Sequence, residues 1–590
     1  MTTAIEAAID VGGNVYLPAG TYLTSSIITK AYTNCKVYGE PGATTIAGSF
    51  GYKMFEILSS NDVIFEDLIF NNTYVNASAG GSVNKGIITS NIELGARVLS
   101  NITFNRCEFT APNSGDMAIM ILATTDSSFG GTCDNLKITN CFFHDIGGIA
   151  ITLMNREVAS DKYEVFKNVT VDNNLVRNIG TIATWGFFIS FDGYGSKFTC
   201  NNNRLEDCKV TGIENTRWIN GDVSGNRFSG FASETWAPIT FSHPDNRISG
   251  MNITNNLCEG SANSKVLFFK VDDSYFAGNS WSSTGTYPVQ YDDSNNNIII
   301  GDKYVSDSSY ACLLVTTTDT FVDGNVTVGT DRITMTSHTF GNRMDVQLTT
   351  TGTLPAGLAL ATTYYTKKID ANTIELYSDL ALTSIVDITA AASGGTHTIE
   401  APCQNNLFSG CTFDASGGTN ATAVAFQHAR TTGNKVIDSV LKKDGGGSAK
   451  IVANLLSASD NIITNSHNTE AVITTNVITE DETGKTFFLD LVGGFTSTLP
   501  APYPGLRYTF IVKTAPTTEY IVTTNGGDNI FYGTLLDIVG EQVAITAQDT
   551  INFVASTSLI GDSLEVESDG TNWYVSAKSL VDGGITVTVT

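Results

Sequence analysis

The chain repeats one short pattern twelve times, and this repeat constrains its fold more than any other feature. In each copy an apolar residue is followed three places later by a central residue, and two places after that by a second residue, apolar in eleven of twelve copies. Apart from one larger gap, successive copies lie 23 to 39 residues apart without helical periodicity, which indicates a solenoid. The central residues are Leu68, Cys107, Cys141, Asn174, Asn203, Asn226, Asn256, Asn279, Asp302, Cys411, Ser439 and Ser466.

Each copy predicts a strand, a tight turn and a second strand. In the segment 169–178, Val169 and Val171 alternate with polar residues, Asp and Asn follow, and Val176 returns to the core. Asn tolerates left-handed backbone, and stacked Asn side chains about 4.8 Å apart can form a hydrogen-bonded ladder. Such a ladder satisfies buried polar groups that would otherwise cost about 1–3 kcal/mol each. We therefore predict an all-β chain built on a parallel β-helix. A propeller would repeat at about 40–50 residues, and a sandwich would show no register between its turns.

The repeat also divides the chain. Residues 1–60 are expected to form an N-terminal cap, with a short helix in "TAIEAAID", and the first coils, and residues 61–318 the main β-helix. The pattern is interrupted between Asp302 and Cys411, which predicts a small inserted β-domain at 319–401. The β-helix continues over 402–476, and strands of different spacing over 477–590 predict a C-terminal β-sandwich-like domain for trimerisation or glycan binding.

Composition excludes several partners. Acidic residues outnumber basic ones 59 to 33, so a net charge of −26 argues against nucleic acid or an anionic membrane. No apolar run reaches membrane-spanning length, so we expect no membrane insertion, and no secretory signal peptide is visible. The ten Cys lack CxxC spacing, and several occupy core positions of the repeat, which favours reduced core residues over a zinc site. We expect neither a metal nor another cofactor.

The N-terminal segments "AIEAAIDVGGNVYLPAGTYLTSSI" and "VYGEPGATTIAG" resemble the first coils of pectate-lyase-like right-handed β-helix proteins. Within that superfamily the chain is most similar to phage tailspikes and capsule depolymerases. "ATTYYTKKIDANTIELYSD" is similar to a small module of phage tail proteins, and the C-terminal segment to terminal domains that hold tailspikes as trimers. The resemblance implies a homotrimer on the virion tail, in contact with other tail proteins, that binds and often cleaves a bacterial surface polysaccharide. No catalytic motif of the family transfers residue by residue.

Candidate catalytic residues come from the outward faces of strands. In "GFFISFDG" (186–193) alternation directs Phe188, Ser190 and Asp192 outward, and the next coil carries Glu214. Two carboxylates about 5–9.5 Å apart perform glycoside hydrolysis, one as acid and one as nucleophile or base. Asp192 and Glu214 are therefore the preferred pair for endo-glycosidic hydrolysis, although solvated acids on an acidic surface would look the same. The other candidate carboxylates are Glu234 and Asp245.

Aromatic and cationic residues on the same coils are candidates for substrate binding, because indole faces stack on sugar rings. Packing in the core or at a trimer interface is the alternative for the Trp residues. The candidates are Trp185, Trp218, Trp236, Arg217, His243 and Lys270.

Other functions stay open at this point. A polysaccharide lyase would need a base and a cation beside a uronate carboxylate, for which Arg217, His243 and Lys270 could serve. A non-catalytic receptor-binding tail protein would share the fold, the Trp cluster and the trimer. A secreted bacterial β-helix enzyme or adhesin is a further alternative.

Overall fold

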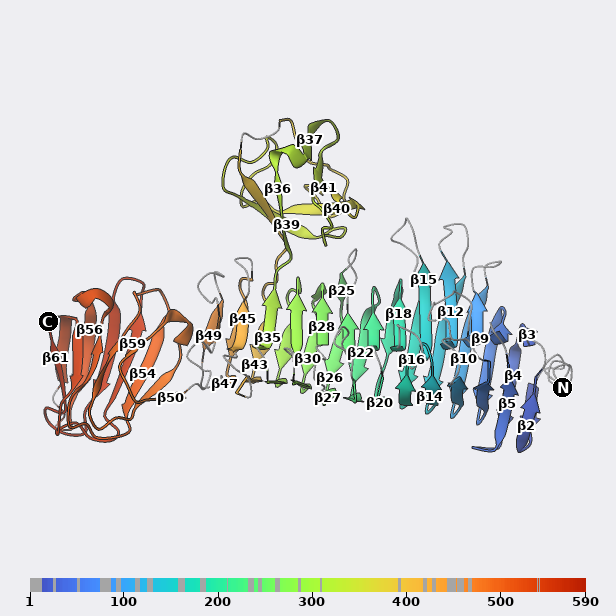
Figure 1. The fold of residues 1–590 in the computed structure, drawn as a ribbon, viewed down its shortest axis with the longest axis horizontal. Helices are drawn as coiled ribbons and strands as arrows, with labels where there is room; N and C mark the ends of the chain where they lie inside the picture. The colour runs from blue at the N-terminus through green and yellow to red at the C-terminus, as the bar shows by residue number, and fades with distance from the viewer. Residues whose placement is uncertain are drawn as a thin grey trace.

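The repeat is a stack of coils in the computed structural model (Figure 1). Phe104, for example, pairs in register with Phe65 on one side and with Ile138 on the other. The structure describes residues 13–24, 28–49, 53–74, 86–91, 97–111, 117–124, 131–156, 165–180, 187–208, 211–231, 238–241, 247–259, 266–284, 288–307, 310–390, 394–416, 422–426, 431–442, 452–453, 461–464, 469–538, 540 and 542–589. The expected N-terminal helix lies outside the described residues.

In the described part of the chain, to which the strand counts below also refer, three long parallel sheets form the sides of a right-handed parallel β-helix, as the repeat and the resemblance predicted. They are here called A, B and C. Each coil passes from sheet A to sheet B and then to sheet C before the next coil begins.

Sheet A has 14 strands, in the order β1 (Gly13–Leu17), β4 (Thr33–Gly39), β7 (Ser60–Glu66), β10 (Val98–Asn105), β13 (Thr132–Thr139), β16 (Phe166–Asp172), β19 (Gly195–Thr199), β22 (Ile219–Ser224), β26 (Asn252–Thr254), β30 (Tyr275–Ala277), β33 (Ile298–Ile300), β43 (Leu407–Ser409), β46 (Lys435–Ile437) and β49 (Ile462–Thr464). Sheet B has 13 strands, in the order β2 (Gly20–Leu23), β5 (Thr44–Gly48), β8 (Ile69–Asn72), β11 (Glu108–Ala111), β14 (Phe142–Ile146), β17 (Leu175–Ile179), β20 (Arg204–Glu206), β23 (Arg227–Ser229), β27 (Leu257–Cys258), β31 (Ser280–Ser283), β34 (Lys303–Ser306), β44 (Thr412–Asp414) and β47 (Val440–Lys442).

Sheet C also has 13 strands, in the order β3 (Ile28–Lys30), β6 (Lys53–Ile57), β9 (Gly86–Asn91), β12 (Met117–Thr124), β15 (Ile151–Arg156), β18 (Phe187–Asp192), β21 (Thr211–Asn215), β24 (Ile239–Phe241), β28 (Val266–Phe269), β32 (Val289–Asp292), β35 (Tyr310–Val315), β45 (Thr422–Phe426) and β48 (Val452–Ala453). Two short strands, β25 (Ile248–Ser249) and β29 (Val271–Asp272), pair with each other at the corner between sheets C and A.

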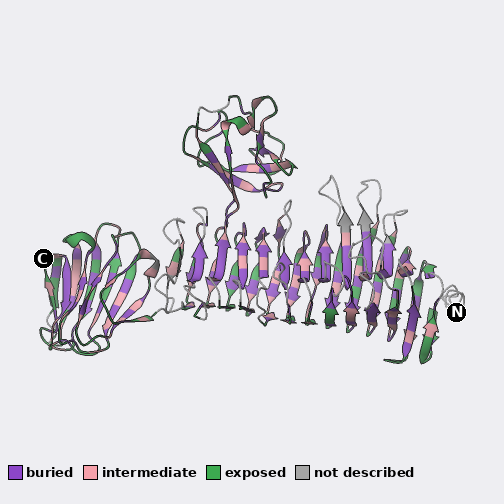
Figure 2. Ribbon diagram, viewed as in Figure 1, coloured by how far each residue is buried: buried purple, intermediate pink, exposed green. Residues whose placement is uncertain are grey.

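The core runs along the inside of the coils, where the two apolar positions of the repeat lie (Figure 2). Aromatic rings stack from coil to coil, with ring centroids 5.0 Å apart for Phe70 and Phe109 and 4.9 Å for Phe109 and Phe143. All ten cysteines are buried and free, as predicted from their places in the repeat.

The Asn ladder is present. The Nδ2 atom of Asn174 donates to Oδ1 of Asn203 over 3.0 Å, and the same contact joins Asn203 to Asn226, Asn226 to Asn256, and Asn256 to Asn279. In each of these contacts the backbone N–H of the donor Asn also donates to the Oδ1 atom that its side chain contacts. This ladder therefore satisfies buried backbone and side-chain groups together.

The left-handed backbone of each turn belongs to the residue before the ladder position, not to the ladder Asn that we expected. Asn173, Asn202 and Asn255 have φ of 60°, 55° and 54°, and Gly225 and Gly278 have φ of 64°. Asn and Gly adopt this conformation at the lowest cost, which explains the Asn-Asn and Gly-Asn pairs in the sequence.

A second ladder escaped the sequence analysis. Asn297, Asn406 and Asn434 are linked by Nδ2–Oδ1 hydrogen bonds of 2.9 Å at the entrance to sheet A. The first of these bonds joins residues 109 positions apart and so bridges the interruption in the repeat. The coils on the two sides of the insertion are therefore neighbours in the stack.

The inserted segment forms one antiparallel sheet around a core of its own and stands off the side of the rod (Figure 1). The sheet has seven strands, namely β36 (Thr318–Val322), β37 (Val326–Thr327), β38 (Arg332–Thr334), β39 (Asp345–Thr350), β40 (Tyr364–Asp370), β41 (Thr373–Tyr377) and β42 (Thr396–Glu400). Two 3-10 turns, η1 (Asp323–Asn325) and η2 (Val328–Thr330), lie among them.

The C-terminal segment consists of two sheets that share a third core. One contains β50 (Thr469–Val472), β52 (Thr486–Leu489), β54 (Arg507–Val512), β59 (Ser563–Ser568), β60 (Trp573–Lys578), β56 (Phe531–Leu536) and β57 (Gln542–Gln548). The other contains β51 (Asn476–Val477), β53 (Phe495–Thr498), β55 (Tyr520–Thr523), β58 (Thr550–Phe553) and β61 (Ile585–Thr588), and the 3-10 turns are η3 (Glu480–Glu482) and η4 (Asn525–Gly527).

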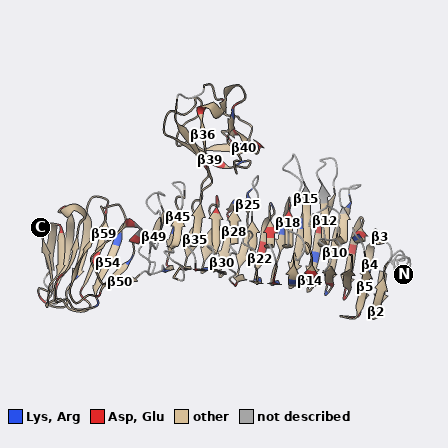
Figure 3. Ribbon diagram, in the orientation of Figure 1, with Lys and Arg blue, Asp and Glu red and all other residues tan. Residues whose placement is uncertain are grey.

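The described residues form three separate cores, one in the β-helix, one in the insertion and one in the C-terminal segment. Strands β50 and β51, which begin at Thr469 and Asn476, already belong to the C-terminal sheets. The predicted domain boundaries stay predictions. No helix in the described part of the chain has the length and apolar character needed to cross a membrane. Figure 3 shows Lys and Arg scattered singly among acidic residues over the described part of the chain.

Candidate active site

Asp192 and Glu214 lie on neighbouring strands of sheet C. Strands β18 and β21 pair in parallel, with Ser190 opposite Glu214. Ile189 and Phe191 of β18 and Ile213 of β21 point into the core. Alternation along the strands therefore directs both carboxylates to the outer face of the sheet.

Each carboxylate is held by a hydroxyl from the neighbouring coil. The Oγ of Ser190 donates to Oε2 of Glu214, and the Oγ1 of Thr216 donates to Oδ1 of Asp192 over 3.0 Å. Thr216 also accepts the backbone N–H of Gly193 over 2.9 Å. Ser190 and Thr216 are 4% and 8% exposed, so these tethers are nearly shielded from water. The two acids are thereby held in defined positions.

The environment changes the proton affinity of one acid. The pKa of Glu214 is raised to about 7, mainly by burial; the hydrogen bond from Ser190 opposes this change, and the charge of Asp192 adds to it. A carboxyl group with a pKa near neutrality can donate a proton at physiological pH. Glu214 therefore has the property of a general acid.

Two short turns follow the carboxylate strands. Only Gly193 and Tyr194 separate β18 from β19, whereas a longer segment separates β15 from β16 in the preceding coil. After β21, Asn215 forms the next turn because its Oδ1 accepts the N–H of Trp218 over 2.8 Å and its Nδ2 donates to the carbonyl of that residue over 3.0 Å. Arg217 stands in this turn, with its guanidinium carbon 5.0 Å from the centre of the Tyr194 ring.

Trp218 is not a substrate-binding residue, contrary to our prediction. Its side chain is fully buried and packs on Phe166, Phe191 and Phe198, with ring centroids 5.2, 4.8 and 5.7 Å away. The indole fits because Gly195 lies beneath it, where a Cβ atom would stand 2.4 Å from the ring. A ring without exposed surface cannot stack on a sugar.

Lys270 is not a substrate-binding residue either, contrary to our prediction. Its side chain has 0% exposure, and its ammonium group lies 4.8 Å from the ring of Phe269. Its φ of 57° marks the corner between β28 and β29, where the chain turns and the simple alternation of a strand no longer applies. Phe188 also departs from the expected outward direction, because its ring packs on Phe143 in the core at 6.0 Å.

The structure brings together Asp192, Glu214 and Arg217 from the predicted set. It adds Ser190, Thr216 and Tyr194, which sequence reasoning missed as partners. The sequence contains a pattern that could have predicted the two hydroxyls. "SFD" and "ENT" each place a hydroxyl and a carboxylate two residues apart, a spacing that in extended chain directs both side chains to one face. The other predicted site residues lie outside the described residues, and they are Trp185, Glu234, Trp236, His243 and Asp245.

Comparison with known proteins gives a partial match. Residues 1–214 match the family model described as rhamnogalacturonase A/epimerase, pectate lyase-like. This match supports the pectate-lyase-like part of the resemblance and includes both candidate carboxylates. No curated protein matches the chain.

Solved structures with similarity to the chain include three from different sources. The mannuronan C-5 epimerase AlgE6 A-module of Azotobacter vinelandii has 12% identity and a TM-score of 0.35, over 79% of this chain and 94% of that one. The catalytic unit of a GH87 α-1,3-glucanase from Streptomyces thermodiastaticus has 12% identity and a TM-score of 0.36, over 79% and 65%. Tailspike protein 3 of bacteriophage CBA120 has 12% identity and a TM-score of 0.31, over 53% and 54%.

Proposed function

We propose that this chain is a phage tailspike that binds a bacterial surface polysaccharide and cleaves it by endo-glycosidic hydrolysis. The observation that carries the proposal is the pair Asp192 and Glu214, tethered by hydroxyls on adjacent strands, with the pKa of Glu214 near 7. The pectate-lyase-like match over residues 1–214 supports action on a polysaccharide. The tailspike assignment rests on the resemblance of the sequence.

In the proposed reaction Glu214 protonates the glycosidic oxygen as the bond to the leaving sugar breaks. Asp192 stays ionised and acts on the opposite side of the anomeric carbon. The two residues lie one strand apart and two residues out of register, which corresponds to a Cα separation of about 8 Å. From this offset we infer that the carboxyl groups lie in the range of about 6.5–9.5 Å that leaves room for a water molecule and inverts the anomeric configuration, so Asp192 would activate that water.

Arg217 and Tyr194 stand in the turns beside this pair and are proposed to contact the sugar. A guanidinium donates to hydroxyl or carboxylate oxygens, and the ring of Tyr194 offers a face for sugar C–H groups. Their mutual contact at 5.0 Å orients both. Trp218 supports the site from the core, by packing beneath the turn that carries Arg217.

A lyase on the same scaffold is the second candidate. Among the described members of the predicted set, Arg217 is the candidate cation for a uronate, since Lys270 is buried. The distinguishing experiment is incubation with capsule or O-antigen from a susceptible host. Shortened products without the ultraviolet absorbance of an unsaturated sugar support hydrolysis, and shortened products with it support a lyase. Intact polymer that still binds the protein would leave a non-catalytic receptor-binding role.

The homotrimer and the association with other virion tail proteins are also proposed. A strip of apolar side chains on sheet A supports side-by-side packing of chains: Tyr275, Ile298, Ile300 and Ile462 are 41%, 44%, 43% and 43% exposed. Tyr275 pairs with Ile298, so these two side chains adjoin on neighbouring coils, whereas the exposed Lys435 separates Leu407 from Ile462. We propose two further copies of this chain as its occupants, and action outside the bacterial cell.

A further inference from the structure

The inserted module is connected to the β-helix by a narrow stem. Thr317 leads into the module and Ala401 leads out of it, and the N–H of Ala401 donates to the carbonyl of Thr317 over 2.9 Å. Oδ1 of the buried Asp293 accepts the N–H of Thr317 over 2.7 Å. Two adjacent connections at one point act as a hinge, so the stem alone would leave the module free to tilt.

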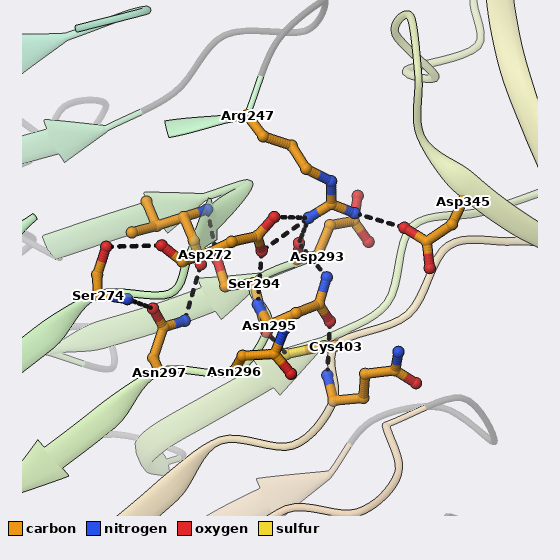
Figure 4. A network of polar contacts seen from close by, with 12 residues as sticks. Arg247, Asp272, Ser274, Asp293, Ser294, Asn295, Asn296, Asn297, Asp345 and Cys403 are labelled. Atoms are coloured by element: carbon orange, nitrogen blue, oxygen red, sulfur yellow. Dashed lines mark hydrogen bonds and ion pairs between the residues drawn. The ribbon is translucent and has the colours of Figure 1, made fainter. Parts of the chain in front are cut away.

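A second attachment is made by a side chain from an earlier coil of the β-helix. Nη2 of Arg247, in the β-helix, donates to Oδ1 of Asp345, the first residue of β39 in the module, over 2.8 Å (Figure 4). Nη1 of Arg247 donates to both carboxylate oxygens of Asp272 over 2.8 and 2.6 Å, and to the carbonyl of Asp293 over 3.1 Å. One guanidinium therefore joins three coils of the β-helix to the module.

The network is shielded from water. The side chains of Arg247, Asp272 and Asp345 are 21%, 12% and 25% exposed. Burial disfavours the charge of Arg247, but the neighbouring carboxylates of Asp272, Asp345 and Asp293 outweigh it and raise its pKa. An ion pair with restricted access to water, fixed by several hydrogen bonds, holds its geometry better than an exposed pair.

The position of this attachment relates the module to the candidate site. The module leaves the β-helix after β35, whereas Arg247 belongs to the coil of β24, three strands earlier in sheet C and next to β21, which carries Glu214. At about 4.8 Å per coil, the backbone of Arg247 lies about 14 Å before the stem along the rod, in the direction of the carboxylates. Its guanidinium reaches forward to Asp293, the residue that also holds Thr317 of the stem. A polysaccharide that runs along the rod from Glu214 toward the C-terminal end next reaches this coil.

We propose that Arg247 is a latch: its ion pair with Asp345 fixes the inserted module in one orientation beside the candidate site, where the module extends the glycan-binding surface. The orientation is independent of catalysis, and the extension of the glycan surface rests on the proposed function. Arg247 is thus a positioning residue, and the module is a fixed wall that contacts long substrates.

The orientation is tested by a distance measurement between spin labels at Thr334→Cys in the module and Lys303→Cys on sheet B, in samples diluted with unlabelled chain. Both positions are exposed, and all ten native cysteines are buried, so the labels attach selectively. We expect one narrow distance distribution for the otherwise unchanged protein and a broad one for Asp345→Asn. The matched control is Asp387→Asn, an exposed aspartate of the same module. A broad distribution before mutation, or an unchanged one after Asp345→Asn, would overturn the latch.

The extension of the glycan surface is tested with the same variants. Asp345→Asn is expected to weaken binding of long polysaccharide about tenfold, because a second contact becomes mobile, and to leave cleavage of short oligosaccharides unchanged. Asp345→Glu, which restores the carboxylate, should recover both the narrow distances and the affinity, and so excludes misfolding as the cause. Equal affinities for all variants would overturn the extension. A protein that cleaves no glycan refutes the proposed function instead, while the distance measurement still decides the latch.

Discussion

At the scale of single residues, proton affinity distinguishes Glu214 from a solvated surface acid. Burial raises its pKa to about 7, and the Ser190 hydroxyl and the Asp192 carboxylate act on it from the strand beside it. A general acid works only while protonated. We therefore predict that kcat/KM falls as pH rises above about 7. A rate that keeps rising through pH 7 to 9 would contradict the acid role of Glu214.

The separation of the two carboxylates predicts the stereochemistry of the product. An offset of one strand and two residues gives a Cα separation of about 8 Å, from which we infer a carboxyl separation in the range of inverting enzymes. NMR of the first product formed should therefore show the anomer opposite to that of the substrate linkage. Initial formation of the same anomer would mean that Asp192 is a nucleophile or that another residue takes its place.

Asp302 makes a separate prediction about stability. It ends the first Asn ladder with 0% exposure, and burial raises its pKa to about 7, although hydrogen bonds from Asn279, Trp281 and Tyr304 oppose the change. An acid whose pKa is higher in the folded state stabilises the fold fully below its unfolded pKa, and this contribution is lost as pH rises through about 7. The melting temperature should therefore fall between pH 5 and pH 8, and fall less in Asp302→Asn. Equal slopes for the two proteins would contradict this account.

At the scale of elements, the ladder is the main polar support of the coils. Asn226 accepts from the N–H and Nδ2 of Asn203 and donates to the carbonyl of Cys200 and to Asn256. Asn226→Ala leaves several of these buried groups unpaired, and we expect a loss of about 2–4 kcal/mol. Denaturant unfolding measures it, with the half-buried Asn252→Ala as control. A smaller loss of unfolding free energy for Asn226→Ala than for the control would show that the ladder is not a main support of the coils.

The turn after β18 depends on the absence of a side chain at position 195. Because a Cβ there would stand 2.4 Å from the Trp218 ring, Gly195→Ala should destabilise the fold by about 1–3 kcal/mol and displace the Arg217 turn. Gly324→Ala, where a Cβ would meet nothing within 4 Å, is the control. Equal melting temperatures for the two variants would show that Trp218 is not tightly packed.

The repeat made the coils predictable, because each of its apolar positions marks an inward side chain and strands alternate regularly. Phe104, Phe109 and the Asn ladder were identified in this way. The corners were not predictable by the same rule. Lys270 has left-handed backbone, and Trp218 fills space left by a glycine of the preceding coil, so its burial depends on a contact between coils. Arg247 and Asp345, 98 residues apart, meet only in the folded chain.

At the scale of the whole molecule, the proposed trimer makes the sheet A strip an interface. Ile298→Lys would place a charge in an apolar contact and should shift the sedimentation coefficient toward the monomer, whereas Lys303→Glu, on sheet B, should leave it unchanged. A chain that ends at residue 468, before β50, tests the clamping role of the C-terminal segment. An unaltered trimer in that chain would refute the clamp.

The central proposal is that Asp192 and Glu214 cut a surface polysaccharide. The most direct test is the initial rate of reducing-end release from the host polysaccharide by the unchanged protein, by Glu214→Gln and by Glu259→Gln. Glu259 is the control because it is an exposed acid that directly follows strand β27 of sheet B. We predict a loss of at least about a hundredfold for Glu214→Gln, as expected when a general acid is removed, and an unchanged rate for Glu259→Gln. Full activity in Glu214→Gln would contradict the account.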